Sequence, residues 1–162
     1  INLWKNLVKD KFYTLNDIDI NSQETYVEYN WFTEQLQLIN TSTKITQNLS
    51  KEEYNYKIFA PTFKLTNKKL ISLIGDCTKF VSCNDKEFKD ISFEKQNDIL
   101  SFTISNIKGE FSKIILYCEK KPNKISVNDR DFPIENVSFM DNKLLIPLTF
   151  SNEEDKHIKI LF

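Results

Sequence analysis

The chain has 162 residues, a length that fits one folded domain whose core needs neither disulfide nor metal. Its formal net charge is −1, and twenty-one lysines accompany a single arginine, Arg130. Nucleic-acid readers depend on arginine for bidentate contacts, and a membrane helix needs about 18 consecutive apolar residues. The composition therefore argues against a nucleic-acid partner, and the apolar runs are too short to predict a membrane partner.

The N-terminal segment "INLWKNLVKDKFY" differs in pattern from the rest of the chain. Leu3, Leu7, Val8 and Phe12 fall at helical spacing, which predicts an amphipathic helix of about three turns. We expect a helical lead-in over residues 1–15. From residue 16 onward, short alternating segments replace this pattern, and we expect one domain over residues 16–162.

Alternating segments typical of half-buried strands follow in chain order. The predicted strands cover residues 24–31, 34–39, 43–49, 54–61, 70–75, 98–105, 113–120, 143–150 and 157–162. In the segment 98–105, Leu100, Phe102 and Ile104 share one face, and polar residues occupy the other. Pro147 predicts an edge strand or a bulge, because proline donates no ladder hydrogen bond.

Turn residues separate these segments at intervals of about 8–12 residues. Nine to twelve short strands with such spacing are typical of a β-sandwich or a barrel. The sequence therefore predicts an all-β fold, a two-sheet antiparallel β-sandwich preceded by the short helical lead-in.

Paired carboxylates were considered as candidates for glycoside hydrolysis, which needs two of them across a sugar. The pairs are Asp17 with Asp19, Glu52 with Glu53, and Asp129 with Asp131. Residues i and i+2 of a strand point to the same face, so such pairs could lie close together. Nothing in the sequence sets their two environments apart, and turn or cap chemistry is the favoured interpretation.

No nucleophile, metal site or cofactor loop is predicted. His157 is the single histidine, and the three cysteines, Cys77, Cys83 and Cys118, form no closely spaced metal-binding pair. Two glycines cannot build a phosphate-binding loop. We predict no catalytic residue, no metal and no cofactor. Buried free thiols favour a reducing compartment, and we expect a cytoplasmic protein.

Aromatic residues of the segment "ETYVEYNWF" offer a possible carbohydrate-binding surface, with Tyr26 and Trp31 as the candidates. Alternation places Tyr29 and Trp31 on one face with Val27, which suggests core packing. Tyr26 falls on the opposite face with Glu28 and is free to be exposed. Core packing is the favoured interpretation, and stacking on sugar rings is the alternative.

Gly75 follows an apolar strand in a chain that has only two glycines. A glycine in this place predicts a tight turn or a close approach of two backbone segments. We expect Cys77 and Cys83, on either side of the following loop, to pack as small apolar groups.

The order of several segments resembles the C-terminal region of raffinose synthases and the related seed-imbibition-protein-like α-galactosidases of glycoside hydrolase family 36. These segments are "DIDI", "YVEYNWFTEQLQLI", "YNYKIFAPTFKL" and "LISLIGDCTKFVS". The matching positions within residues 17–82 are Asp17, Asp19, Trp31, Phe59, Pro61, Ile74, Gly75, Lys79, Phe80 and Ser82. After Ser82 the plant members continue with a Gly-rich stretch, whereas this chain reads "CNDKEFKDISF".

The resemblance implies a glycoside hydrolase or glycosyltransferase that acts on α-galactosides. In that family the catalytic carboxylates lie on a (β/α)₈ barrel, and the C-terminal domain is a β-sandwich beside it. A barrel needs at least about 200 residues, so no catalytic residue is carried over to this chain. We expect an accessory domain that packs on and stabilises the barrel, with Asp17, Asp19, Phe59, Pro61, Gly75, Lys79 and Ser82 in structural turns.

Two other functions remain open at this stage. A free-standing carbohydrate-binding module would use Tyr26 or Trp31. A protein-interaction sandwich would form a homodimer through an edge strand.

Overall fold

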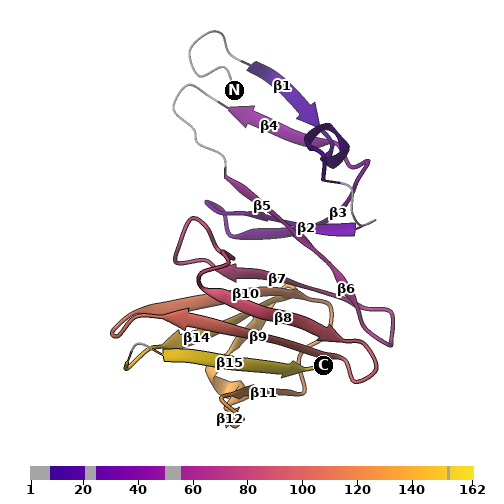
Figure 1. The fold of residues 1–162 in the computed structure, drawn as a ribbon. Coiled ribbons are helices and arrows are strands. Elements are labelled where there is room, and N and C mark those ends of the chain that lie inside the picture. The colour runs from indigo at the N-terminus through magenta and orange to yellow at the C-terminus, as the bar shows by residue number, and fades with distance from the viewer. Residues whose placement is uncertain (1–7, 21–24, 50–55, 153) are drawn as a thin grey trace. The chain divides into compact units, whose positions relative to one another are not determined.

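The computed structural model describes residues 8–20, 25–49, 56–152 and 154–162. These residues form fifteen strands and two short 3-10 helices (Figure 1). The chain divides into two compact units, Ile1–Pro61 and Thr62–Phe162. The sequence predicted a single domain from residue 16. The division after residue 61 was not predicted, because no proline- or glycine-rich linker marks it in the sequence.

The first unit contains two small antiparallel sheets. In one sheet β1 (Val8–Tyr13) pairs with β4 (Ile45–Leu49), and in the other β2 (Thr25–Asn30) lies between β3 (Gln35–Asn40) and β5 (Lys57–Pro61). A short 3-10 helix, η1 (Leu15–Ile18), follows β1. Leu15, Tyr26, Ile39 and Ile45 form a buried cluster in this unit.

The predicted helical lead-in is wrong over Val8–Tyr13, which forms strand β1. Val8 and Phe12 are four residues apart, a spacing that suits a helical face and equally suits one face of a strand. Pairing with β4, from Val8 opposite Leu49 to Tyr13 opposite Ile45, decides between the two. The rest of the predicted helix, residues 1–7, lies outside the described residues.

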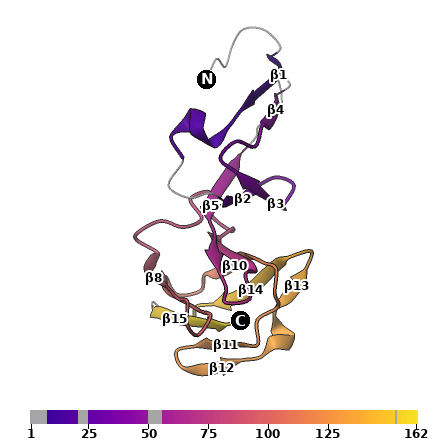
Figure 2. The ribbon, with the colours of Figure 1, turned by 90° about the vertical axis from the view of Figure 1, so that its right-hand side faces the viewer.

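The second unit is a two-sheet antiparallel sandwich, as the sequence predicted. One sheet has the order β13-β14-β10-β7-β6 and the other the order β12-β11-β15-β9-β8. Figure 2 labels β10, β13 and β14 of the first sheet and β8, β11, β12 and β15 of the second. Their strands are β6 (Phe63–Lys64), β7 (Leu70–Asp76), β8 (Phe88–Glu94), β9 (Ile99–Asn106), β10 (Phe111–Cys118), β11 (Lys124–Val127), β12 (Arg130–Phe132), β13 (Ser138–Met140), β14 (Lys143–Thr149) and β15 (Glu154–Leu161). The 3-10 helix η2 (Ile134–Asn136) connects β12 with β13.

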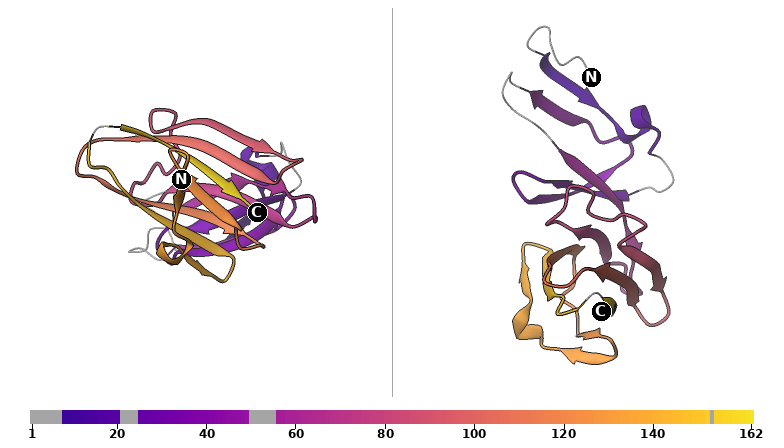
Figure 3. Two further views of the ribbon diagram at one scale, coloured as in Figure 1. Left: turned by 90° about the horizontal axis from the view of Figure 1, so that it is seen from below. Right: turned by 60° about the vertical axis from the view of Figure 1, so that its left-hand side comes forward.

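The core of this unit lies between the two sheets. Phe102 of β9, Ile114 of β10 and Ile158 of β15 are fully buried in it together with inward-facing residues of β7, β11 and β14. Figure 3 shows the same strands in two further views, with the C-terminus at the end of β15. Burial of this apolar set stabilises the sandwich by roughly 25 cal/mol for each Å² removed from water.

The predicted alternation is confirmed in the late strands. Buried and partly exposed residues alternate along the whole of β9, and Leu100, Phe102 and Ile104 are the buried hydrophobic set. The expected edge at Pro147 is also present. β13 pairs with β14 only as far as Leu145, so Pro147 lies where β14 bonds on one side alone, to β10.

Edge strands of the sandwich are short or irregular. β6 has two residues, and β12 and β13 have three each. The fourth edge, β8, is longer, but its register with β9 shifts between Lys89 and Ser92, and Asp90 has φ +53° there. Such interruptions oppose edge-to-edge pairing with another chain.

Asp98 joins two turns of the sandwich and makes its stability sensitive to acid. Its carboxylate accepts hydrogen bonds from the Thr66 amide at 2.8 Å and the Thr66 hydroxyl at 2.6 Å. The Thr66 hydroxyl bond is the main cause that holds the pKa of Asp98 below its usual value, with further help from the Thr66 amide and Lys120.

We expect Thr66→Val to raise the pH at which the protein unfolds in acid. A carboxyl whose pKa is lowered by folding stabilises the native state above its unfolded pKa of about 3.9, and that contribution is lost as pH falls. Circular dichroism during acid titration measures the midpoint. The exposed Thr149→Val on β14 is the control, and equal midpoints for the two variants would contradict the role of Asp98.

Candidate functional site

The candidate site is the β7–β8 loop, residues 77–87, together with Gly75 and Asp76 at its base. Gly75 lies in β7 at a register shift, since Ile115 of β10 pairs with Gly75 and Leu116 pairs with Leu73. Its φ is +108°, and a Cβ built on it would lie 2.0 Å from the backbone oxygen of Ser82. The position therefore requires glycine, for the close backbone approach that the sequence predicts.

Ser82 closes the base of this loop against β7. Its backbone oxygen accepts the Asp76 amide at 2.6 Å, and its hydroxyl donates to the Ile74 carbonyl at 2.7 Å. The Ser82 side chain is buried among these contacts. Both polar groups of Ser82 thus bond to the strand beside it, and the residue works as part of a structural turn.

Asp76 is fully buried and organises the start of the loop. Its Oδ1 accepts three hydrogen bonds: from the Thr78 amide at 3.0 Å, the Thr78 hydroxyl at 2.8 Å and the Lys113 amide at 3.0 Å. Its Oδ2 is buried without a hydrogen-bond partner within the described part of the chain. Asp76 was missed in the sequence, where only its position directly after Gly75 marks it.

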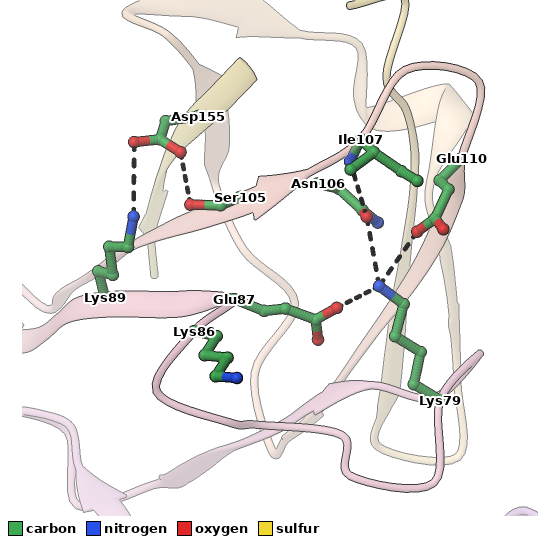
Figure 4. A pocket seen from close by; sticks show the side chains of 9 residues that line it. All are labelled: Lys79, Lys86, Glu87, Lys89, Ser105, Asn106, Ile107, Glu110 and Asp155. Carbon is green, nitrogen blue, oxygen red and sulfur yellow. Dashed lines mark hydrogen bonds and ion pairs between the residues drawn. The ribbon is translucent and has the colours of Figure 1, made fainter. Parts of the chain in front are cut away.

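Lys79 connects the loop with the turn between β9 and β10. Its ammonium group donates to Glu87, to Glu110 at 3.1 Å and to Asn106 at 3.2 Å (Figure 4). Burial by itself lowers the pKa of Lys79, but the hydrogen bonds and charges of Glu87 and Glu110 outweigh it, so the pKa is raised. Lys79 therefore stays charged at neutral pH and cannot serve as a general base.

A shallow hollow of about 640 Å³ lies beside this network. Besides Lys79 and its three partners, its lining consists of Lys86, Lys89, Ser105, Ile107 and Asp155. Asp155 accepts a hydrogen bond from Ser105 and forms an ion pair with Lys89 at 3.9 Å (Figure 4). The acidic side chains of the hollow are thus neutralised by its own lysines.

Two of the three thiols, Cys83 and Cys118, are not activated. Partial desolvation by the loop around it, with the charges of Asp85 and Glu87, raises the pKa of Cys83 to about 11, although much of its surface is exposed. Burial also raises the pKa of Cys118 well above its usual value. A thiol with a raised pKa stays protonated at neutral pH and is a poor nucleophile. Cys118 packs in the sandwich core as a small apolar group. Cys83 is exposed, although the sequence predicts that it packs as a small apolar group.

The alternative prediction, that Tyr26 is exposed and stacks on sugar rings, is wrong. Tyr26 is 3% exposed and packs with Leu15, Ile39 and Ile45, because the β1–η1–β4 segment supplies apolar side chains to that face of β2. Trp31 is half-buried and meets Tyr29 and Tyr56 edge-on, with ring centroids 6.4 and 5.8 Å apart. Tyr26 and Trp31 thus do not form the pair of exposed rings that a sugar platform requires.

The carboxylate pairs serve turns, caps and ion pairs. Asp17 Oδ2 accepts the Thr14 amide at 2.7 Å and the Thr14 hydroxyl at 2.8 Å at the start of η1, which lowers the pKa of Asp17. Asp19 ends η1 with φ +58°. Asp129 forms an ion pair with Lys159 at 2.7 Å, and Asp131 forms one with Lys124 at 2.6 Å. Residues 52 and 53 lie outside the described residues.

The remaining positions of the resemblance fall in the first unit. Phe59 of β5 is partly buried and packs against the cluster around Tyr26. Pro61 is exposed at the end of β5, opposite Tyr26 in the sheet. The positions from Ile74 to Ser82 fall in the second unit, so the resemblance spans both units.

Within the described segments, no group of three or more His, Cys, Asp or Glu side chains is placed to hold a metal ion. None of the helices described here has the length and apolar character to cross a membrane. No protein-family model and no curated protein matches the chain.

Proposed function

We propose that this chain is a non-catalytic β-sandwich domain of a glycoside hydrolase that resembles α-galactosidases and raffinose synthases. Its role is to pack on a catalytic (β/α)₈ barrel and stabilise it. The proposal starts from the resemblance of residues 17–82 and is supported by one structural observation, the construction of the β7–β8 loop.

The loop is built as a rigid support with an apolar tip. Gly75, Asp76 and Ser82 fix its base by backbone and side-chain hydrogen bonds. Phe80 and Val81 at the tip are 64% and 62% exposed. Exposed apolar side chains on an ordered loop are typical of a contact surface, whereas a catalytic loop exposes groups that can accept or donate protons.

The hollow beside Lys79 also fits a contact with another folded domain. Ile107 is 56% exposed and shares the lining of the hollow with charged side chains. Apolar side chains within a polar rim are the usual anatomy of a protein interface. We therefore assign Phe80 and Val81 as the barrel-facing residues of the proposed domain.

The first test is the intact mass of the native polypeptide that contains this sequence. We expect a mass that exceeds the 19.2 kDa of this chain by at least the roughly 200 residues of a barrel, together with hydrolysis of an aryl α-galactoside. A native mass equal to that of this chain would contradict the proposal. Sugar binding by the chain alone would favour the carbohydrate-binding module instead.

A variant pair tests the contact surface in that longer protein. We expect Phe80→Ser with Val81→Ser to lower the thermal midpoint of the barrel's activity, because the tip loses its apolar contact. Met140→Ser is the matched control, since Met140 is 65% exposed on β13 of the same sandwich. An equal effect of the two changes would remove the loop as the docking surface.

A further inference from the structure

One lysine links the β7–β8 loop to the neighbouring turn. The three acceptors of the Lys79 ammonium come from three different places: Glu87 from the end of the loop, Asn106 from the end of β9, and Glu110 from the turn before β10 (Figure 4). Two of these acceptors are carboxylates. The link therefore depends on the ionisation of Glu87 and Glu110.

Hydrogen bonds hold the base of the loop, whereas ion pairs of Lys79 hold the part of the loop beyond it. The base uses hydrogen bonds between backbone groups and buried side chains, chiefly those of Gly75, Asp76 and Ser82. Between the base and β8, the side chain of Lys79 supplies the ion pairs that hold the loop to the β9–β10 turn. Loss of these ion pairs would leave the base intact and free the segment that carries Phe80 and Val81.

The other charged groups around the hollow do not replace Lys79 in this link. Asp155 of β15 is occupied by Ser105 and by Lys89 of β8. The second oxygen of Glu87 accepts the Asn84 side-chain amide at 2.8 Å, within the loop itself. Lys86 is exposed and lines the same hollow, and Figure 4 draws no interaction from its ammonium group to the other lining residues.

We propose that Lys79 is an acid-released latch of the β7–β8 loop. At neutral pH it ties the loop to the β9–β10 turn through Glu87 and Glu110. Protonation of these two glutamates removes both ion pairs and releases residues 79–81, while the base of the loop and the sandwich stay folded. This inference concerns the chain itself and does not depend on the proposed function. If Phe80 and Val81 dock on a barrel, the latch makes that docking sensitive to pH.

Amide hydrogen exchange of residues 79–81 tests the latch, with protection factors referred to unstructured-peptide rates at the same pH. Wild-type protection is expected to fall about five- to tenfold between neutral pH and a pH that protonates carboxylates, the size expected for a few partly exposed ion pairs. Peptides from β9 and β14 report whether the sandwich remains folded.

The variants separate the latch from a general charge effect. We expect Lys79→Met to show the low, acid-like protection already at neutral pH and to lose its pH dependence. Lys86→Met removes the same charge from the same hollow and is expected to behave like the wild type. Glu110→Gln imitates the protonated glutamate and is expected to give an intermediate loss at neutral pH, which also covers the case in which Lys79→Met folds poorly.

Three outcomes would overturn the latch. The first is that the protection of the loop in the wild type does not change in acid while β9 stays protected. The second is that Lys79→Met and Glu110→Gln both keep the protection of the wild type at neutral pH. An effect of Lys86→Met as large as that of Lys79→Met is the third, because it would show that net charge, and not the link, governs the loop.

Discussion

Gly75→Ala is expected to destabilise the sandwich by more than about 3 kcal/mol, which is a large share of the roughly 5–15 kcal/mol by which an ordinary domain is stable. The new Cβ would lie 2.0 Å from the oxygen and 2.6 Å from the carbonyl carbon of Ser82. Both are backbone atoms that cannot rotate away. The substitution must therefore separate β7 from the end of the loop and break the bond between the Asp76 amide and the Ser82 oxygen.

Gly109→Ala is the matched control for this prediction. Gly109 has a positive φ of +86°, so it carries a similar backbone penalty, but a Cβ there meets no atom within 4 Å. We expect a cost of about 1 kcal/mol, which is the conformational cost alone. Urea unfolding followed by circular dichroism measures both variants. Equal losses of unfolding free energy would mean that the close approach of Ser82 does not govern the site.

Asp76→Ala is expected to cost about 2–4 kcal/mol of unfolding free energy. The alanine removes the acceptor of three hydrogen bonds, from the Thr78 amide, the Thr78 hydroxyl and the Lys113 amide. The Lys113 amide belongs to β10 and reaches Asp76 at the end of the neighbouring strand β7. Leaving a buried donor unsatisfied costs more than the net gain of the original bond.

Two further variants make the Asp76 prediction specific. Asp85→Ala removes an exposed carboxylate of the same loop and is expected to change stability by less than about 0.5 kcal/mol. Asp76→Asn keeps an acceptor oxygen at the position of Oδ1, and we expect it to lose less stability than Asp76→Ala. A loss in Asp76→Asn as large as in Asp76→Ala would show that the negative charge, and not the acceptor, is what the loop requires.

These effects bear on the proposed function, because two of the residues that fix the base of the loop, Gly75 and Ser82, also carry the resemblance. Gly75 and Ser82 are occupied in holding two backbone segments together. Lys79 is occupied in the ion pairs with Glu87 and Glu110. A loop of this construction positions Phe80 and Val81 for contact, which supports an accessory domain more than a catalytic one.

Much of the sandwich could be predicted from the sequence because strand alternation is local. Leu100, Phe102 and Ile104 alternate with polar residues, and a register slip by one residue would turn them to water. Five strands of the sandwich were missed: β6, β8, β11, β12 and β13. β8 is mostly exposed, and the other four have only two to four residues, so none of them shows a long apolar alternation.

The candidate site was only partly visible in the sequence. Gly75 stood out because the chain has two glycines, and its need for a close approach follows from the chemistry of glycine. Asp76, Glu87 and Glu110 did not stand out among twenty-three acidic residues. What distinguishes them is the partners that the fold brings to them, Lys113 of β10 for Asp76 and Lys79 for both glutamates, and these partners lie up to 37 positions away in the chain.

The sequence by itself determined the all-β class, the inward faces of the late strands and the need for glycine at position 75, because each depends on neighbouring residues alone. Only the tertiary structure decided that residues 8–13 form a strand, that Tyr26 is buried and that Lys79 meets two glutamates. Each of these depends on which distant strand lies alongside. The pairing of β1 with β4, the apolar cluster against β2 and the turn between β9 and β10 supply those neighbours.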